Sequence, residues 1–315
     1  MADKKTKTNS VKIVGYLKEN NLEQIVNARG DKVIRGSIIV ATDKISSHKI
    51  QFYVAERTSN GEDSKDYASL LGLLPDNTIT VASFLKENPD ADFAMASNAA
   101  SKVWVMARFE EYATKVGERT RSMITLKGFR AGFSTIKADK PFKPCAEFDV
   151  DIYINKMTDE TDNDGKKTGR ILIEGLIPKY DGSVDKIDFV AVQDNNVANY
   201  IDKNYKVSDT VLIKGDVVSI QERAVVAGSD ESDLFFGRSS AAPQYETVFV
   251  RERRIMGGAK TPIHQGEEGS ISLEFVKNGL AARELKMVAN GEKSSNNVST
   301  AKVSKPSFTA EDLDF

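Results

Sequence analysis

Two short stretches, KIQFYVAE at residues 49–56 and KIDFVAV at residues 186–192, decide how the fold of this chain is read. Both begin with a Lys-Ile-x-Phe pattern and are rich in the β-branched and aromatic residues that favour strands. A glycine precedes each of them, Gly36 and Gly175, and the intervening turns differ by two residues. Each stretch also lies at the same place within two identical orders of predicted elements. We infer an internal duplication of a unit with three strands, one helix and two further strands.

The first unit begins where the polar, Lys-rich start of the chain gives way to VKIVGYL. Its alternating apolar residues indicate a half-buried strand. Between the third and fourth strands, KDYASLLGLL has its large apolar residues at helical spacing. The predicted elements are strands at residues 11–17, 33–41 and 49–56, a helix at 65–74, and strands at 102–111 and 122–134.

The second unit follows FKPCA, where Pro141 and Pro144 interrupt both the helical and the strand period and so predict a linker. The same order of elements then returns. It comprises strands at residues 148–157, 170–180 and 186–192, a helix at 196–205, and strands at 209–221 and 246–256.

Beyond Met256 the apolar pattern weakens. Residues 272–289 fit either a hairpin arm or a helix that packs on the second unit. From Asn290 onward the chain is rich in Ser and Asn and poor in apolar residues, which predicts a disordered tail ending in EDLDF. The expected organisation is a flexible arm at residues 1–10, a first unit at 11–135, a linker at 136–146, a second unit at 147–260, a C-terminal extension at 261–289 and the tail at 290–315.

Composition excludes several classes of function. The 315 residues include 44 Lys and Arg against 46 Asp and Glu, a net charge of −2, which by itself does not favour a polyanion ligand. No run of about 18 apolar residues is present, and the N-terminus has no apolar signal stretch, so we expect a cytoplasmic protein without a membrane partner.

The residues needed for catalysis or metal binding are also scarce. Cys145, His48 and His264 cannot assemble a Cys/His zinc site, and neither a complete P-loop nor a nucleophile arrangement is found. His48 is expected to be a turn or surface residue. We predict that the protein is not an enzyme and needs no cofactor.

The near-neutral total conceals a basic block at residues 101–145, where ten Lys and Arg stand against four Asp and Glu. The same block holds six aromatic residues. Basic residues interleaved with aromatics suit a protein that follows a phosphate backbone and stacks exposed bases. The competing interpretation is a solvated basic face over a barrel core that includes Phe109, Phe129 and Phe133, and for any single aromatic it is the stronger one.

Strand alternation separates core from surface within this block. Along residues 102–111, Val103, Val105, Ala107 and Phe109 face one side, which suits a core. Trp104 faces the other side, which suits a ligand. By the same alternation Tyr53 opposes the apolar residues of its own strand, so it joins Trp104 as a stacking candidate.

The second unit contributes its own candidates. A long connection at residues 222–245 contains Phe235 and Phe236, which either cap the end of a barrel or clamp a ligand. Cations accompany them at Arg223 and Arg238. The next strand carries further cations along one element, at Arg251, Arg253 and Arg254.

The repeated order of elements resembles the OB-fold, a five-stranded barrel that typically binds oligonucleotides. The tail ending in EDLDF is similar to the acidic, Phe-terminated tip of bacterial and phage single-stranded DNA-binding proteins. The resemblance implies a mainly β chain with two tandem five-stranded OB-fold barrels and a disordered acidic C-terminal tail. The divergence of the two halves resembles a phage-encoded member, which would act in the cytoplasm of its bacterial host.

The same resemblance implies sequence-independent binding and protection of single-stranded DNA during replication, recombination and repair. The tip would recruit replication or recombination proteins, with Asp312, Leu313, Asp314 and Phe315 as the contacting residues. The expected DNA-binding residues are Arg35, Lys49, Tyr53, Trp104, Arg108, Arg119, Arg121, Lys127, Arg130, Tyr180, Lys186, Arg223, Phe235, Phe236, Arg238, Arg251 and Arg253.

Two alternatives remain open at this point. One is a viral structural or assembly protein in which the barrels and tail mediate protein contacts. The other is a single-stranded RNA-binding protein, which would share every feature used above. Two units in one chain suggest a monomer or a dimer, so a homo-oligomer stays open as well.

Overall fold

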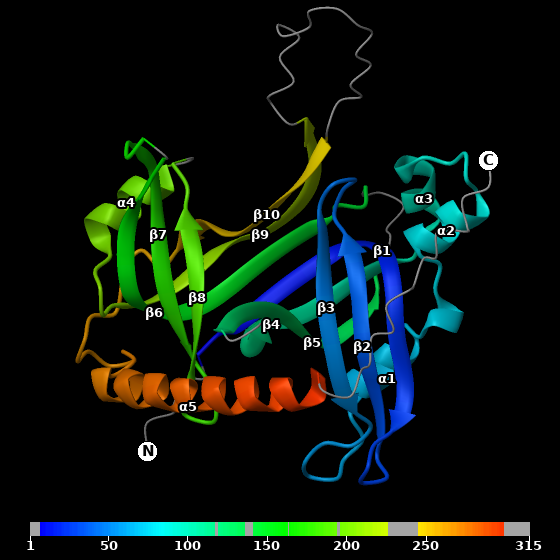
Figure 1. Cartoon of the computed structure of the whole chain (residues 1–315), viewed down its shortest axis with the longest axis horizontal. Helices are drawn as coiled ribbons and strands as arrows, with labels where there is room; N and C mark the ends of the chain where they lie inside the picture. Colours follow the sequence, from blue (N-terminus) through cyan, green and yellow to red (C-terminus); the bar gives the residue numbers. More distant parts are fainter. Residues whose placement is uncertain are drawn as a thin grey trace, which may run out of the picture.

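The structure is a computed structural model that describes residues 7–116, 119–135, 141–162, 164–193, 196–225 and 245–298 (Figure 1). Side chains are described for these residues except 113–116, 119–120, 222–225, 245–247 and 290–298. The described part is mainly β, and its ten strands belong to one continuous sheet that closes twice into a barrel. The predicted fold class is confirmed.

The first barrel closes in the order β1-β2-β3-β5-β4-β1. Neighbouring strands are antiparallel except for β3 and β5, which run parallel and complete the ring. Gly128 makes this closure close-packed, because a Cβ there would lie 2.3 Å from the ring of Phe52. The strands are β1 (Asn9–Val26), β2 (Lys32–Ala41), β3 (Ser47–Ala55), β4 (Lys102–Val116) and β5 (Arg119–Phe133).

The second barrel repeats this topology in the order β6-β7-β8-β10-β9-β6, with β8 and β10 as its parallel pair. Its strands are β6 (Cys145–Thr161), β7 (Lys167–Pro178), β8 (Val184–Ala191), β9 (Thr210–Val225) and β10 (Tyr245–Gly258). Helix α4 (Val197–Asn204) connects β8 to β9, as predicted. Two barrels of the same strand order agree with the inferred duplication.

The local sequence match is only partly preserved in the register of the strands. Gly36 lies opposite Phe52, whereas Gly175 lies opposite Ile187, two positions earlier in the shared Lys-Ile-x-Phe pattern. Counted from the turn of each hairpin, the tetrapeptides take the same place and the glycines do not. The two-residue difference between the turns accounts for this offset. The closing parallel pair involves residues 50–52 in the first barrel but 190–191 in the second.

Antiparallel pairing of β1 with β6 joins the two barrels. Beneath this junction Phe109, Phe148 and Phe189 pack together, with ring centroids 5.5–6.2 Å apart. The buried side chains of both barrels form one contiguous core. Because a shared core resists sliding, the barrels are held at a defined angle.

The alternation predicted for β4 is confirmed. Val103, Val105, Ala107 and Phe109 are all at most 2 % exposed, while Trp104 on the opposite face is half-buried. The core interpretation of the two other phenylalanines is wrong, because Phe129 is 36 % and Phe133 is 47 % exposed. A bulge at Met106 and Ala107 disturbs the pairing of β4 with β5 just where Phe129 lies, so simple alternation fails there.

The connection between β3 and β4 holds more helix than the single one predicted. It contains α1 (Lys65–Leu71), the 3-10 turn η1 (Pro75–Asn77), α2 (Val81–Glu87) and α3 (Phe93–Ala99). Each α-helix is only seven residues long and is defined by its N-cap side chain, including a capping box between Thr80 and Ser83. Helices this short have little apolar periodicity, which explains why they were missed.

Several expected boundaries move. β6 begins at Cys145, inside the predicted linker, and β1 begins at Asn9, inside the predicted arm. Of the two alternatives for residues 272–289, the helix is correct: α5 (Leu273–Val298) runs beneath both barrels and passes the expected start of the tail at Asn290 (Figure 1). Residues 299–315 lie outside the described residues.

The carboxylate of Glu111 links three parts of the molecule. Its side chain, within β4, is 2 % exposed and receives two hydrogen bonds of 2.6 Å from the Arg283 guanidinium of α5. The backbone amide of Lys186 on β8 donates to it at 3.0 Å, and the Ser122 hydroxyl of β5 donates as well. Burial raises the pKa of Glu111, but these donors outweigh burial and hold that pKa below its ordinary value.

Replacing Glu111 with Gln keeps the shape of the side chain but leaves Arg283 without its carboxylate. We expect the free energy of unfolding at pH 7, measured by urea denaturation, to fall by about 3 kcal/mol. Because the folded-state pKa lies below the ordinary 4.5, the contribution of the carboxylate is present above pH 4.5 and is lost as the pH falls through the folded-state value. The difference between the wild type and E111Q should therefore shrink in acid.

The matched control is Glu23→Gln. Glu23 pairs with Arg35 at 2.6 Å, but 54 % and 52 % of the two side chains are exposed. We expect this variant to change stability by roughly 0.5 kcal/mol or less. A loss in E111Q as small as that in E23Q would show that the buried carboxylate does not hold the barrels together.

Candidate nucleic-acid interface

A groove lies between the first barrel and the hairpin formed by β9 and β10 of the second barrel. Its volume is about 440 Å³. One wall comes from β3, β4 and β5, and the other from β9 and β10. We call it the open groove. The side chains that line it and reach solvent include Lys49, Gln51, Tyr112, Met123, Phe249 and Arg251.

The strands position these side chains by alternation. On β3, His48, Ile50 and Phe52 point into the core, so Lys49 and Gln51 point outward to the groove. The hairpin is held against the first barrel where the backbone amide of Gln221 donates to the carbonyl of Ile45 at 3.0 Å. The groove is therefore bounded by two elements that are fixed to each other.

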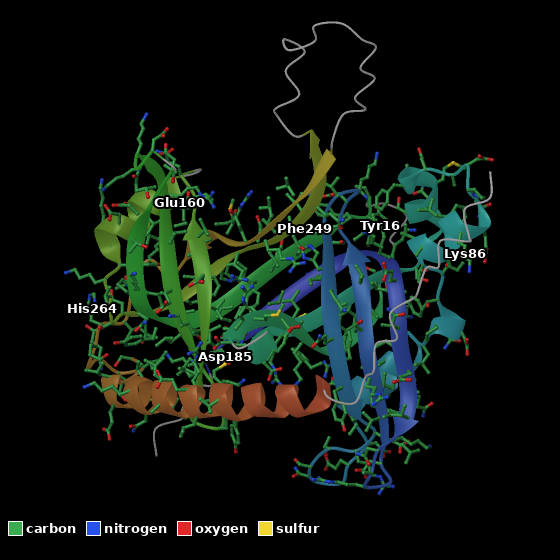
Figure 2. The ribbon with its side chains drawn as sticks, in the orientation of Figure 1. Tyr16, Lys86, Glu160, Asp185, Phe249 and His264 are labelled. Carbon is green, nitrogen blue, oxygen red and sulfur yellow. The ribbon has the colours of Figure 1, made fainter. Side chains whose placement is uncertain are left out.

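Exposed aromatic surface lies on both walls. Phe249 on β10 is 58 % exposed, and the Arg251 guanidinium lies 5.8 Å from the centroid of its ring. Figure 2 shows Phe249 between the hairpin and the first barrel. On the facing wall Tyr112 is 37 % exposed, and its hydroxyl lies 3.6 Å from the Met123 sulfur. Flat apolar surface beside a guanidinium suits stacking of a planar ligand.

The lining of the groove is cationic. Within the described residues, neither Lys49 nor Arg251 has a carboxylate partner in an ion pair. Arg253 donates to the carbonyl of Asp188 at 2.6 Å, which neutralises none of its charge. The one carboxylate of the lining, Glu252, is engaged by Arg170 at 2.6 Å and by Arg254 at 2.7 Å. Burial raises the pKa of Glu252, but the two guanidinium groups outweigh burial and hold that pKa below its ordinary value. The carboxylate is therefore ionised at pH 7.

His48 differs from its prediction. It is 2 % exposed on β3 rather than at a turn or on the surface, because the strand begins two residues earlier than expected and places it on the inward face. Burial lowers the pKa of His48 to about 4. The imidazole is therefore neutral at pH 7 and adds no charge to the groove.

The groove brings together three of the predicted DNA-binding residues, Lys49, Arg251 and Arg253. Tyr53 lies outside its lining but shares the outward face of β3 with Lys49 and Gln51, and it is 56 % exposed. Trp104 lies elsewhere. Its ring covers Gly132 on β5, at the end of β4 remote from Tyr112.

Other predicted cations are distributed over the barrels, and several are paired. Arg108 and Arg121 are exposed, and Tyr180 is fully exposed in the turn between β7 and β8. The ion pairs are Arg35 with Glu23 at 2.6 Å, Lys127 with Glu110 at 3.1 Å, Arg130 with Asp66 at 2.5 Å, and Lys186 with Glu174.

Some predicted residues cannot be placed. Arg119 lies on β5 and Arg223 on β9, in segments whose side chains are not described. Phe235, Phe236 and Arg238 lie outside the described residues, as do Asp312, Leu313, Asp314 and Phe315 of the tail. Their roles stay predictions.

Sequence reasoning missed Phe249, Tyr112 and Met123. A signal was present for Phe249, because it alternates with Arg251 along FVRER and must therefore share its face. Tyr112 and Met123 gave no such signal, since they reach the groove only through the pairing of β4 with β5.

No group of three or more His, Cys, Asp or Glu side chains in the described segments is arranged to hold a metal ion. None of the helices described combines the length and the apolar character needed to cross a bilayer.

Comparison with known proteins places the chain in a family. The family model YorF matches residues 7–284, which includes both barrels and the start of α5. The chain belongs to the YorF family. No curated protein matches it by sequence.

Among solved structures, the YorF-family chain is similar to the single-stranded DNA binding protein from Thermus aquaticus. A deletion mutant of that protein aligns with a TM-score of 0.43 and 8 % identity, covering 81 % of this chain and 94 % of that one. The wild-type protein aligns with a TM-score of 0.41 and 9 % identity, covering 81 % and 93 %.

Proposed function

We propose that this protein binds single-stranded DNA without sequence specificity, with the open groove as its central binding surface. The observation that carries this proposal is the lining of the groove, where cations that have no carboxylate partner among the described residues lie beside exposed aromatic side chains. Lys49, Arg251 and Arg253 are suited to hold phosphates, and Phe249 and Tyr112 to stack bases. Binding of this kind tolerates any sequence, because every base has a flat face.

The dimensions of the groove favour a single strand over a duplex. A volume of about 440 Å³ lies within the range of sites for a single small ligand, so the groove accommodates about one or two nucleotides at a time and not a duplex. The outward face of β3 extends the surface beyond the groove through Tyr53. A strand leaving the groove along β3 would pass this ring.

We further propose that the protein acts in DNA replication, recombination or repair, and that its tail recruits partner proteins. In this proposal Phe315 enters an apolar pocket on the partner, while Asp312 and Asp314 meet the basic rim of that pocket. The composition of EDLDF, with acidic groups around two large apolar side chains, supports this role.

Titration of labelled oligo(dT) followed by fluorescence anisotropy tests the DNA proposal. Three cations that each neutralise one phosphate should give a slope of about −2 in a plot of log affinity against log salt concentration. Matched duplex DNA and RNA oligonucleotides complete the experiment. Tight binding to the duplex but not to the single strand would refute the proposal. A preference for the RNA oligonucleotide would show that single-stranded RNA, and not DNA, is the ligand.

Substitution of Phe249 by Ala removes the most exposed ring of the groove. We expect the affinity for oligo(dT) to fall about tenfold or more, in line with the ~1–3 kcal/mol that one stacked base contributes. The control is Phe133→Ala on β5, which removes a ring that is 47 % exposed but lies outside the groove lining and should leave affinity unchanged. Equal losses in the two variants would contradict stacking in the groove.

Removal of residues 311–315 tests the role of the tail. We expect affinity for oligo(dT) to stay the same or to rise, because an acidic segment competes with DNA for a cationic surface. Binding to purified replication or recombination proteins of the host should be lost. If the truncated chain no longer bound oligo(dT), the tail would be part of the DNA-binding surface instead.

A further inference from the structure

The two barrels reach across to each other in the same way. The hairpin of β9 and β10 extends from the second barrel over β3 of the first, and the hairpin of β4 and β5 extends from the first barrel towards β8 of the second. Each hairpin forms a corner with the barrel that it reaches. One corner is the open groove. The other, between β4, β5 and β8, is filled by α5, and we call it the α5 corner (Figure 1).

The repeated tetrapeptide identifies matching positions in the two corners. In an alignment of KIQF with KIDF, Lys49 of the open groove corresponds to Lys186 of the α5 corner. The residue before each lysine is also buried in both barrels, as His48 in the first and Asp185 in the second. The corners therefore share their architecture and differ in their charged groups.

The α5 corner is rich in carboxylates that already have cationic partners. The side chain of Glu111 binds Arg283 of α5, and that of Asp181 binds Lys286 of α5. Asp185 lies 3.2 Å from Lys179, and Lys186 is paired with Glu174. Figure 2 shows Asp185 close above the helix. A polyanion would meet negative charge here if the helix were absent.

The packing of α5 also closes this corner. Gly279 allows close approach to β8, because a Cβ there would lie 2.7 Å from the Val184 side chain. Phe275, Val276 and Leu280 pack on a cluster formed by Tyr153, Leu176, Val184 and Ile271. The helix therefore covers apolar surface of the second barrel in addition to neutralising its carboxylates.

The open groove has the opposite character. Lys49 is exposed there and has no carboxylate partner among the described residues, whereas its counterpart Lys186 has one. Three of the four charged residues in the groove lining, Lys49, Arg251 and Arg253, are cations. The fourth, Glu252, is paired with Arg170 and Arg254, which are not part of the lining. Of the two corners, only this one offers positive charge and space.

We propose that each chain binds one single-stranded segment, through the open groove alone, and that the second barrel serves as a clamp and scaffold whose own corner is permanently occupied by α5. This inference rests on the proposed function. It adds how many DNA segments one chain binds and which of the two corners binds them. It also removes Lys186 and Tyr180 of the second barrel from the DNA-binding surface that the sequence suggested.

The matched pair Lys49→Ala and Lys186→Ala tests this proposal. In K49A we expect affinity for oligo(dT) to fall roughly fivefold and the salt slope to become shallower by about 0.7. In K186A both should stay unchanged. Because loss of the pair with Glu174 could disturb folding, Tyr180→Ala provides a second variant, in which a fully exposed side chain is removed and affinity should again be unchanged.

Calorimetric titration of the full chain with an oligo(dT) just long enough for one groove supplies the stoichiometry, for which we expect one oligonucleotide per chain. Two oligonucleotides per chain, or losses in K186A or Y180A equal to that in K49A, would overturn the single-groove inference and leave the proposed function standing. Absence of binding by the wild-type chain would overturn both.

Discussion

A buried carboxylate requires donors, and Glu111 takes its donors from three parts of the chain. Burying an ion without partners is so unfavourable that β5, β8 and α5 can occupy only the positions relative to β4 that bring their groups to this one oxygen pair. The shared aromatic core restricts sliding of the barrels, while the carboxylate restricts their rotation. The residue that follows it, Tyr112, lines the open groove. The wall of the binding surface is thus set by a charge on the other side of the same strand.

The duplication preserved topology and changed chemistry. Both barrels close in the same order with the same parallel pair, because the alternation of apolar residues needed for a barrel core tolerates many sequences. Outward positions carry no such requirement. At matching sites they differ in charge, as the neutral Gln51 and the acidic Asp188 do. An internal copy gives a protein a second wall for one groove without requiring that the second barrel form a groove of its own.

Period-two patterns were sufficient to predict the strands and the exposed face of β3, because these depend on neighbours in the chain. What escaped prediction depends on distant residues. Glu111 is an ordinary acidic residue until Arg283, which lies 172 positions later, is placed beside it. Tyr112 and Phe249 line the same groove only because the hairpin of the second barrel lies over the first barrel. The short helices α2 and α3 depend on caps at Thr80 and Asp92, which a search for apolar periodicity does not detect.

The long separation between Glu111 and Arg283 has a consequence for how the molecule is made. A chain synthesised from its N-terminus completes every strand of the first barrel before any of the second has emerged. At that stage neither the Arg283 guanidinium nor the Lys186 amide is available to Glu111, so only water and the Ser122 hydroxyl can solvate its carboxylate. Full pairing of this carboxylate requires α5, the last described element to be synthesised.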